Sequence, residues 1–146
     1  MASYNKFNFF VQDLCEGLHN FKTSGGGTYK ILLTNSAPNS STWHVLADVT
    51  GELTTTGGYT AGGATITLSS ESQTSGTEKV VVSAGSPTWT GSGGGMGPFR
   101  YVVFYRSDST NKELVCWFDY GSSISLNATD TFTVTFDGSN GLFQLT

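Results

Sequence analysis

Charged residues are scarce in this chain. Lysine, arginine, aspartate and glutamate make up 12% of its 146 residues, about half the usual share of a globular protein. The formal net charge is −4, and the seven lysines and arginines are scattered along the sequence. A protein that neutralises nucleic-acid phosphates needs a clustered basic surface. The sequence therefore argues against nucleic acid as a partner.

Long hydrophobic runs are also missing. No apolar stretch approaches the roughly 20 residues that cross a membrane as a helix. The N-terminal stretch MASYNKFNFFVQDL has one lysine, and Asn, Gln and Asp interrupt its apolar residues, which makes it a poor secretory signal. We therefore expect no membrane partner and a protein that is synthesised in a cytoplasm.

Cysteine and histidine are rare, which limits metal and redox chemistry. Cys15 and Cys116 are the only cysteines, and both lie in apolar settings, DLCEGL and LVCWF. A buried free thiol is the common outcome there, although a disulfide closing a long loop is the alternative. His19 and His44 are the only histidines, and neither has a second His or Cys at metal-ligand spacing. We expect no metal and no cofactor, and a capping or packing role for each histidine.

A glycine-rich stretch, TGSGGGMGP at residues 90–98, raises the question of a phosphate cradle. A P-loop needs a Gly-Lys pair, and none occurs in this chain. The dinucleotide fingerprint fails because Met96 stands where its third glycine belongs, and because a strand follows instead of a helix. We expect these glycines to give the backbone freedom to enter the strand that follows, with Pro98 setting the entry angle.

Catalytic constellations are not recognisable either. There is no G-x-S-x-G motif, and most carboxylates fall in turn clusters, where they cap or are solvated. Asp119, between Phe118 and Tyr120, is the exception, and it could act with a second carboxylate on a glycan. A carboxylate that accepts turn N–H groups at the end of a strand is the more common alternative. We predict no catalytic residue and a protein that is not an enzyme.

What the chain does contain points to β structure. Gly, Ser and Thr together account for 58 residues, and aromatic residues for 13%, a composition of turns and hydroxyl-rich strands. Short apolar runs alternate with turn clusters such as NSAPNSST, SESQTSGT and DGSNG, and no helical pattern lies between them. The predicted strands are 29–34, 44–49, 64–68, 78–84, 88–90, 99–106, 114–120, 131–136 and 141–145. This spacing is typical of an antiparallel sandwich or a barrel, and we predict a mainly β fold with a sandwich.

The first residues follow a different period. Apolar residues at positions 7, 10, 11, 14, 18 and 21 are three or four apart, as on one face of a helix. A strand that starts at Phe7 is the alternative, since KFNFF also alternates. We predict one amphipathic helix at 5–21, a β-sandwich at 28–146, and a single domain over 1–146.

Several segments together resemble one known family. The stretches KFNFFVQDLCEGLHNF, YKILLTNSAPN, GGYTAGG, GPFRYVVFY and CWFDYGSSISL are similar to a family of small virion proteins of tailed bacteriophages. The resemblance runs from about residue 6 to residue 145, and it is most specific at 30–38, 58–63, 97–105 and 117–126. It implies a structural protein of the virion, and, in the related head-decoration or cement proteins, a jelly-roll fold and a trimer at symmetry axes of the capsid. It offers no catalytic residues.

The residues that would make such contacts belong to two groups. The helix face offers Phe7, Phe10, Val11 and Leu14 for docking, and the strand at 99–106 offers Phe99, Tyr101 and Tyr105 for self-association. Burial in the core of the same chain is the alternative for all of them. We expect a capsid decoration or cement protein on the outside of the virion, with the major capsid protein and itself, as a homotrimer, for partners. The alternative is a tail- or fibre-associated protein that binds a glycan or receptor.

Overall fold

The structure is a computed structural model that describes residues 2–74, 76–82, 86–137 and 141–145. Its strands are β1 (Ser3–Lys6), β2 (Tyr29–Thr34), β3 (Ala64–Ile66), β4 (Leu68–Thr74), β5 (Thr77–Val82), β6 (Thr88–Thr90), β7 (Met96–Arg106), β8 (Leu114–Leu126), β9 (Thr131–Thr133) and β10 (Phe143–Leu145). The described residues also contain one α-helix, α1 (Phe9–Cys15), and a 3-10 helix at Leu46–Asp48. The predicted mainly β class is confirmed.

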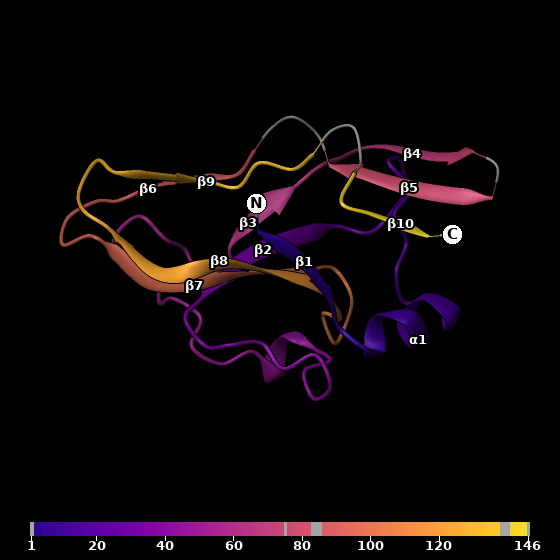
Figure 1. Cartoon of the computed structure of the whole chain (residues 1–146), viewed down its shortest axis with the longest axis horizontal. Helices are drawn as coiled ribbons and strands as arrows, with labels where there is room; N and C mark the ends of the chain where they lie inside the picture. Colours follow the sequence, from indigo (N-terminus) through magenta and orange to yellow (C-terminus); the bar gives the residue numbers. More distant parts are fainter. Residues whose placement is uncertain (1, 75, 83–85, 138–140, 146) are drawn as a thin grey trace.

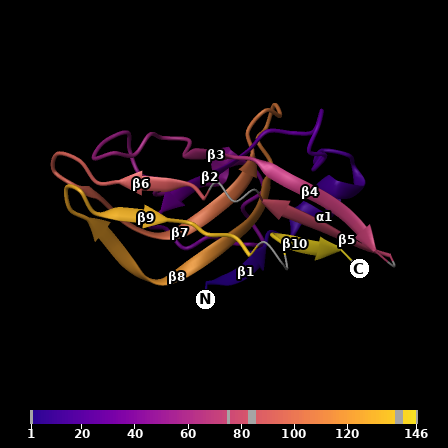
Figure 2. The same cartoon turned by 90° about the horizontal axis from the view of Figure 1, so that it is seen from above.

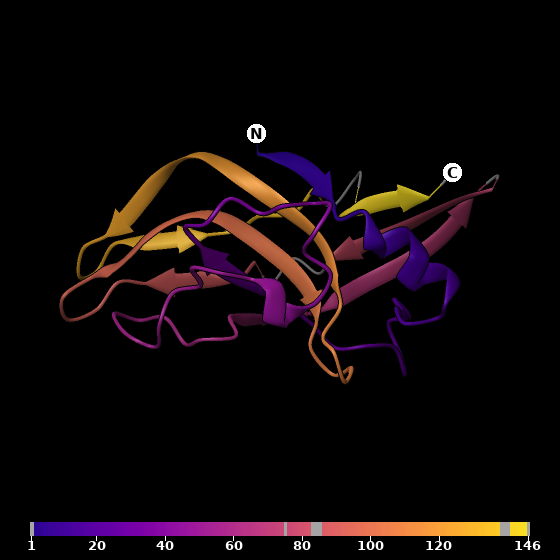
Figure 3. The same cartoon turned by 90° about the horizontal axis from the view of Figure 1, so that it is seen from below.

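A five-stranded antiparallel sheet is the centre of the molecule. Its strand order is β1-β8-β7-β2-β3. The β7–β8 hairpin contains the longest strands, and both are strongly curved (Figure 3). The runs YVVFY and LVCWF are apolar at consecutive positions, so they suit strands that are covered on both faces. Val102, Val103, Phe104 and Cys116 are all buried, as this pattern requires.

Two small sheets form a second layer over one face of the large sheet. The sheet β10-β5-β4 and the pair β6-β9 lie side by side along it (Figures 1 and 2). The interlayer core joins aromatic and aliphatic side chains of both layers, among them Ile31, Leu33, Phe99, Phe104, Trp89, Val80 and Phe143. The fold is thus an antiparallel, sandwich-like arrangement. The jelly-roll strand order stays a prediction.

The opposite face of the large sheet is covered by the chain itself. The long connection between β2 and β3, which includes the 3-10 helix, passes beneath the sheet (Figure 1). A second apolar cluster forms there from Phe7, Leu32, Trp43, Val103, Tyr105 and Leu114. The two-sided apolar strands therefore find their cover inside one chain.

The N-terminal helix predicted at 5–21 is wrong in its extent. Residues Ser3–Lys6 form strand β1 on the edge of the large sheet, and the helix is limited to Phe9–Cys15. Pairing of β1 with β8 satisfies backbone groups that a helix would otherwise bond internally, and it places Phe7 in the lower core. The alternative noted above, a strand that starts at Phe7, is wrong as well, because β1 ends at Lys6 and Phe9 already belongs to the helix.

Other segments also differ from the predicted bounds. The strand predicted at 44–49 is instead a loop with the 3-10 helix, in which the Asp48 carboxylate accepts hydrogen bonds from the His44 and Val45 N–H groups. The polar stretch SESQT, predicted as a turn, belongs to β4 because it pairs with β5. Strand β8 runs on to Leu126, and β9 ends at Thr133.

The glycine-rich stretch at 91–97 makes a tight backbone approach. Gly93, Gly95 and Gly97 have φ values of 55°, 93° and 125°. A Cβ on Gly95 would lie 2.5 Å from the Leu126 carbonyl oxygen. The glycines before Met96 thus turn the chain into β7 as predicted, but the strand begins at Met96, so Pro98 lies within it and not at its entry. Within the described ranges no helix has the length and apolar character needed to cross a membrane.

Candidate functional site

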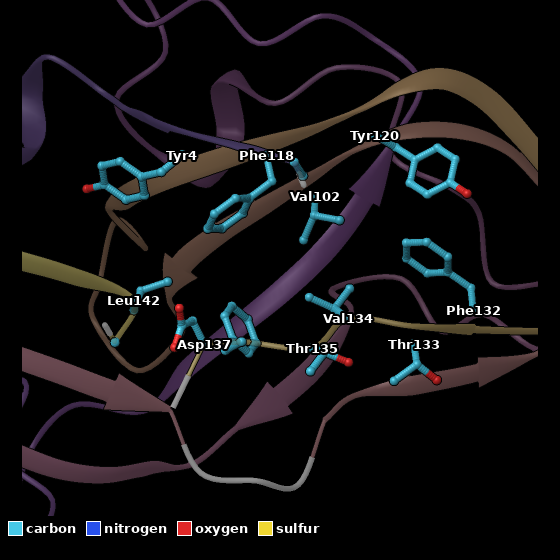
Figure 4. Close-up of a pocket in the computed structure, with 13 residues that line it drawn as sticks. Tyr4, Val102, Phe118, Tyr120, Phe132, Thr133, Val134, Thr135, Asp137 and Leu142 are labelled. Carbon is cyan, nitrogen blue, oxygen red and sulfur yellow. The ribbon is translucent and has the colours of Figure 1, made fainter. Parts of the chain in front are cut away.

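An apolar groove opens along one side of the sandwich, between the edge of the large sheet and the end of β9 (Figure 4). It encloses a cavity of about 450 Å³. Its walls come from β1, β7 and β8 on one side and from β9 and the chain after it on the other. The lining residues are Ala2, Tyr4, Val102, Phe118, Tyr120, Phe132, Thr133, Val134, Thr135, Phe136, Asp137, Gly141 and Leu142. Both the size and the mainly apolar lining are typical of binding pockets.

Aromatic rings dominate this groove. Tyr4 packs edge-on against Phe118 at a centroid distance of 6.0 Å, and Tyr120 packs edge-on against Phe132 at 6.0 Å. Figure 4 shows the two tyrosines on the large-sheet side, with Phe132 opposite Tyr120. Tyr4 is 39% exposed and Tyr120 is 56% exposed, so both present large apolar area to the solvent. Partly exposed tyrosines of this kind are frequent anchors in protein interfaces.

Two strand edges flank the groove. Strand β1 pairs with β8 only as far as Asp119, and beyond that point β8 pairs with β7 alone among the described residues. Strand β9 pairs with β6 on one side, and no described strand pairs with its other side. An open strand edge can bind an extended peptide through its backbone. The groove therefore combines an apolar floor with backbone hydrogen-bonding groups at its rim.

Asp119, the candidate acid, lies between two groove residues, Phe118 and Tyr120, but does not line the groove itself. Successive residues of a strand point to opposite faces of the sheet. The Asp119 carboxylate accepts two hydrogen bonds from the Arg100 guanidinium at 2.7 and 2.8 Å, and one from the Gly121 N–H at 2.7 Å. The Arg100 contact lowers the pKa of this carboxyl. A general acid at neutral pH needs a raised pKa instead. The hydrogen bond from the Gly121 N–H matches the expected alternative, a carboxylate that accepts turn N–H groups. The strand does not end there, however, because β8 continues to Leu126.

The seven predicted contact residues are not brought together. Phe7, Phe10, Phe99, Tyr101 and Tyr105 are buried, none with more than 8% of its surface exposed. We correct the expectation of a contact surface for these five, because they fill the core of their own chain. Leu14 is half-buried against the same core, and Val11, at 45% exposed, is the one that points outward.

The groove residues themselves escape single-sequence reasoning. The alternation of TFTVTF does predict that Phe132, Val134 and Phe136 share one face. Nothing in the sequence indicates that Tyr4 and Tyr120, 116 positions apart, line the same cavity with them. Pairing of β1 with β8 creates that proximity.

A buried polar cluster lies at the other end of the sheet. Asp13 Oδ1 is 2.8 Å from His44 Nε2, and Asp13 Oδ2 is 3.8 Å from His19 Nε2. Of the two roles predicted for His19, capping and packing, the structure shows packing, because the helix ends at Cys15 and the imidazole is buried among aromatic rings. Burial lowers its pKa to about 4. Within the described part of the chain, no group of three or more His, Cys, Asp or Glu residues could hold a metal ion.

The two cysteines have different environments. Both are free thiols. Cys116 is fully buried in β8, as predicted, and burial raises its pKa well above the usual value. Cys15 is exposed, which corrects the expectation of burial, because the helix turns that side chain away from the sheet.

The chain was compared with protein-family models, with curated proteins and with solved structures, and none of the three comparisons found a match.

Proposed function

We propose that this chain is a non-enzymatic virion protein of a tailed bacteriophage that decorates the capsid and stabilises the head. The proposal starts from the sequence resemblance of residues 6 to 145 to small virion proteins. The observation that carries it is the groove, with Tyr4 and Tyr120 exposed at its rim. An apolar surface of this kind is costly to leave in water and is stabilised when a protein partner covers it.

The rest of the molecule suits such a role. A cement protein resists expansion of the capsid by binding rigidly across subunits, so its scaffold must not deform. The curved β7–β8 hairpin is buried on both faces at Tyr101–Tyr105 and Leu114–Cys116, and this part supplies a stiff base for the groove. In this proposal the major capsid protein fills the groove, and three copies of the chain associate as a homotrimer on the outer surface of the capsid.

The first experiment measures how many copies the virion carries. Quantitative mass spectrometry of purified virions gives the ratio of this protein to the major capsid protein. A decoration protein is expected at a ratio of the same order as the capsid protein, because it follows the capsid lattice. A ratio on the order of a hundredfold lower would contradict decoration and place the protein at the tail or at a single vertex.

A second experiment tests the groove. Virions that lack the protein are incubated with purified Tyr120→Ala, and binding is measured by co-sedimentation. A central interface tyrosine contributes about 1 to 2 kcal/mol, so we expect binding to weaken about 5- to 30-fold. Thr54→Ala is the control, since Thr54 is exposed on the connection between β2 and β3 and does not line the groove. Equal binding by both variants and the wild type would contradict the role of the groove.

A tail- or fibre-associated role with glycan binding is the second candidate, and a different observation favours it. Tyr120 is 56% exposed at the rim of the groove, and the hydroxyl-bearing Thr133 and Thr135 line the same groove. An exposed ring that stacks on a sugar face, with polar side chains nearby for the sugar hydroxyls, is a common glycan-binding arrangement. This candidate predicts that labelled protein binds host cells and competes with phage adsorption, whereas a decoration protein does neither.

A further inference from the structure

Asp13, His19 and His44 form a cluster of polar side chains next to α1. The Asp13 side chain is completely buried, and the His19 side chain is too. Neither nitrogen of His19 has a hydrogen-bond partner, nor does Asp13 Oδ2. Leaving three buried polar atoms unsatisfied costs a fold several kcal/mol at about 1–3 kcal/mol each. Such a cost is usually retained where the group has a role.

The cluster joins three separate parts of the chain. Asp13 belongs to α1, His19 to the segment that follows, and His44 to the connection beneath the large sheet. The His44 ring also stacks on Phe9 at 4.4 Å. In Figure 1, α1 lies across the end of the sandwich, so these contacts fasten the helix to the rest of the molecule.

The aromatic surroundings make the site sensitive to charge. The His19 ring lies edge-on to Phe10 at 5.2 Å and stacks on Phe21 at 5.6 Å and on Tyr29 at 6.1 Å. A neutral imidazole fits this apolar packing, whereas an imidazolium loses its hydration there. Its nearest carboxylate oxygen, Asp13 Oδ2, lies 3.8 Å away, beyond hydrogen-bond distance.

Charged groups of the neighbouring elements do not offset this cost. Those that face the cluster are Glu16 on α1, Arg106 at the end of β7, Glu113 before β8, Asp48 near His44 and Asp108 beside Arg106. Glu113 favours a charged His19, whereas Arg106 and His44 oppose it. Burial is the largest influence on the His19 pKa and lowers it to about 4.

We propose that the Asp13–His19–His44 cluster is an acid-sensitive latch, which holds the segment from residue 9 to residue 21 against the sheet near neutral pH and releases it in mild acid. Protonation of His19 drives the release, because the imidazolium is more stable in water than among the aromatic rings. The two-layered sheet stays folded while the segment opens. The latch is independent of the virion role proposed above.

The sign and size of the effect follow from linkage. The His19 pKa is lower in the closed segment, about 4, than the 6.5 of an exposed histidine. The closed form is therefore fully favoured above pH 6.5 and loses stability as the pH falls towards 4. At pH 5.0 this favours opening about 30-fold relative to pH 7.5. Asp13 acts in the opposite direction, because its raised pKa favours the closed form as its carboxyl gains a proton.

Hydrogen exchange of the whole chain tests the latch. Amide exchange is measured by mass spectrometry at pH 7.5 and 5.0, after correction for the intrinsic pH dependence. In peptides covering residues 9–21 we expect opening to increase at least about fivefold at pH 5.0, with the 30-fold figure as the limit set by His19 alone. Peptides from β7 and β8 are the internal reference and should not change. An equal increase in β7 and β8 would overturn the proposal, as would no increase at 9–21.

Two variants assign the response to one histidine. His19→Phe keeps a ring in the aromatic cluster and removes the titration, so the difference between the two pH values should disappear. His44→Gln is the matched control, and it should retain the difference because His19 is still present. The reverse pattern would overturn the proposal. A direct NMR titration of the wild-type protein decides the matter if either variant fails to fold: a His19 pKa below about 5 supports the latch, and one of about 6 or higher overturns it.

Discussion

Gly63 offers a sharp test of how the backbone of this fold is packed. It precedes β3 with a φ of 72°, and a Cβ built on it would lie 1.9 Å from the Ile31 carbonyl oxygen and 2.8 Å from the Leu32 Cα. Both neighbours are backbone atoms of β2, so neither can turn away like a side chain. Gly63→Ala must therefore push β3 off β2 or distort the central sheet.

Gly25 is a close match for comparison. Its φ is also 72°, but a Cβ there would meet no atom within 4 Å. Gly25→Ala therefore carries only the conformational cost of a left-handed alanine, about 1–2 kcal/mol. Gly63→Ala carries the same cost plus overpacking and weakened β2–β3 pairing, so we expect a loss of about 3–5 kcal/mol.

Urea unfolding followed by tryptophan fluorescence measures both losses. The slope of the unfolding free energy against urea should stay the same if only stability changes. The reasoning would be refuted if the two variants lost equal stability, within about 0.5 kcal/mol, because the close approach to β2 would then contribute nothing.

Three further predictions follow from individual residues. A thiol reagent should modify Cys15 quickly in the folded protein and Cys116 only after unfolding, because Cys116 is buried with a raised pKa. Fast modification of both thiols in the folded protein would contradict this. Phe104→Ala should lower the unfolding free energy by about 3–5 kcal/mol in urea titrations, because Phe104 is fully buried; a loss below about 1 kcal/mol would contradict the described core. Arg100→Met should raise the Asp119 pKa towards its ordinary value, measured by NMR, and should change the unfolding free energy little because the pair is partly exposed. The pair's contribution is present above the ordinary Asp pKa and is lost as the pH falls, so an unchanged Asp119 pKa would show that Arg100 does not hold it.

The strands of the large sheet were largely predictable. Residues 29–34 form β2 with the predicted bounds, and the cores of β7 and β8 lie within the predicted segments. Consecutive apolar and β-branched residues in these segments leave few alternatives to a buried strand. Local pattern and burial agree here, which is why the prediction succeeded.

The prediction failed where a local pattern was compatible with two structures. The stripe at 7, 10, 11 and 14 suits a helix, and positions 10, 11 and 14 do lie in α1. The predicted helix began too early, however, because Asn5 and Lys6 pair with β8 instead. The apolar residues at 44–49 suit a strand, but the Asp48 carboxylate binds two backbone N–H groups and forms a 3-10 turn. In both cases, hydrogen bonds of backbone groups determine the local structure, and the spacing of apolar residues does not reveal them.

For the candidate sites, the sequence supplied the residue types and tertiary structure supplied their positions. The exposed tyrosines, the buried histidine and the carboxylate at Asp119 are all visible in the sequence, but their neighbours are not. Tyr4 meets Phe118 because β1 pairs with β8, and His19 meets Asp13 because the helix ends early.

Composition and periodicity by themselves determined a mainly β chain with a sizeable apolar core, because turn residues and strand propensity act locally. Only the tertiary structure decided which apolar residues stay exposed. Phe99, Tyr101 and Tyr105 became core, whereas Tyr4 and Tyr120 remained at the rim of the groove. Burial depends on contacts between residues that are distant in the chain, and no local pattern encodes those contacts.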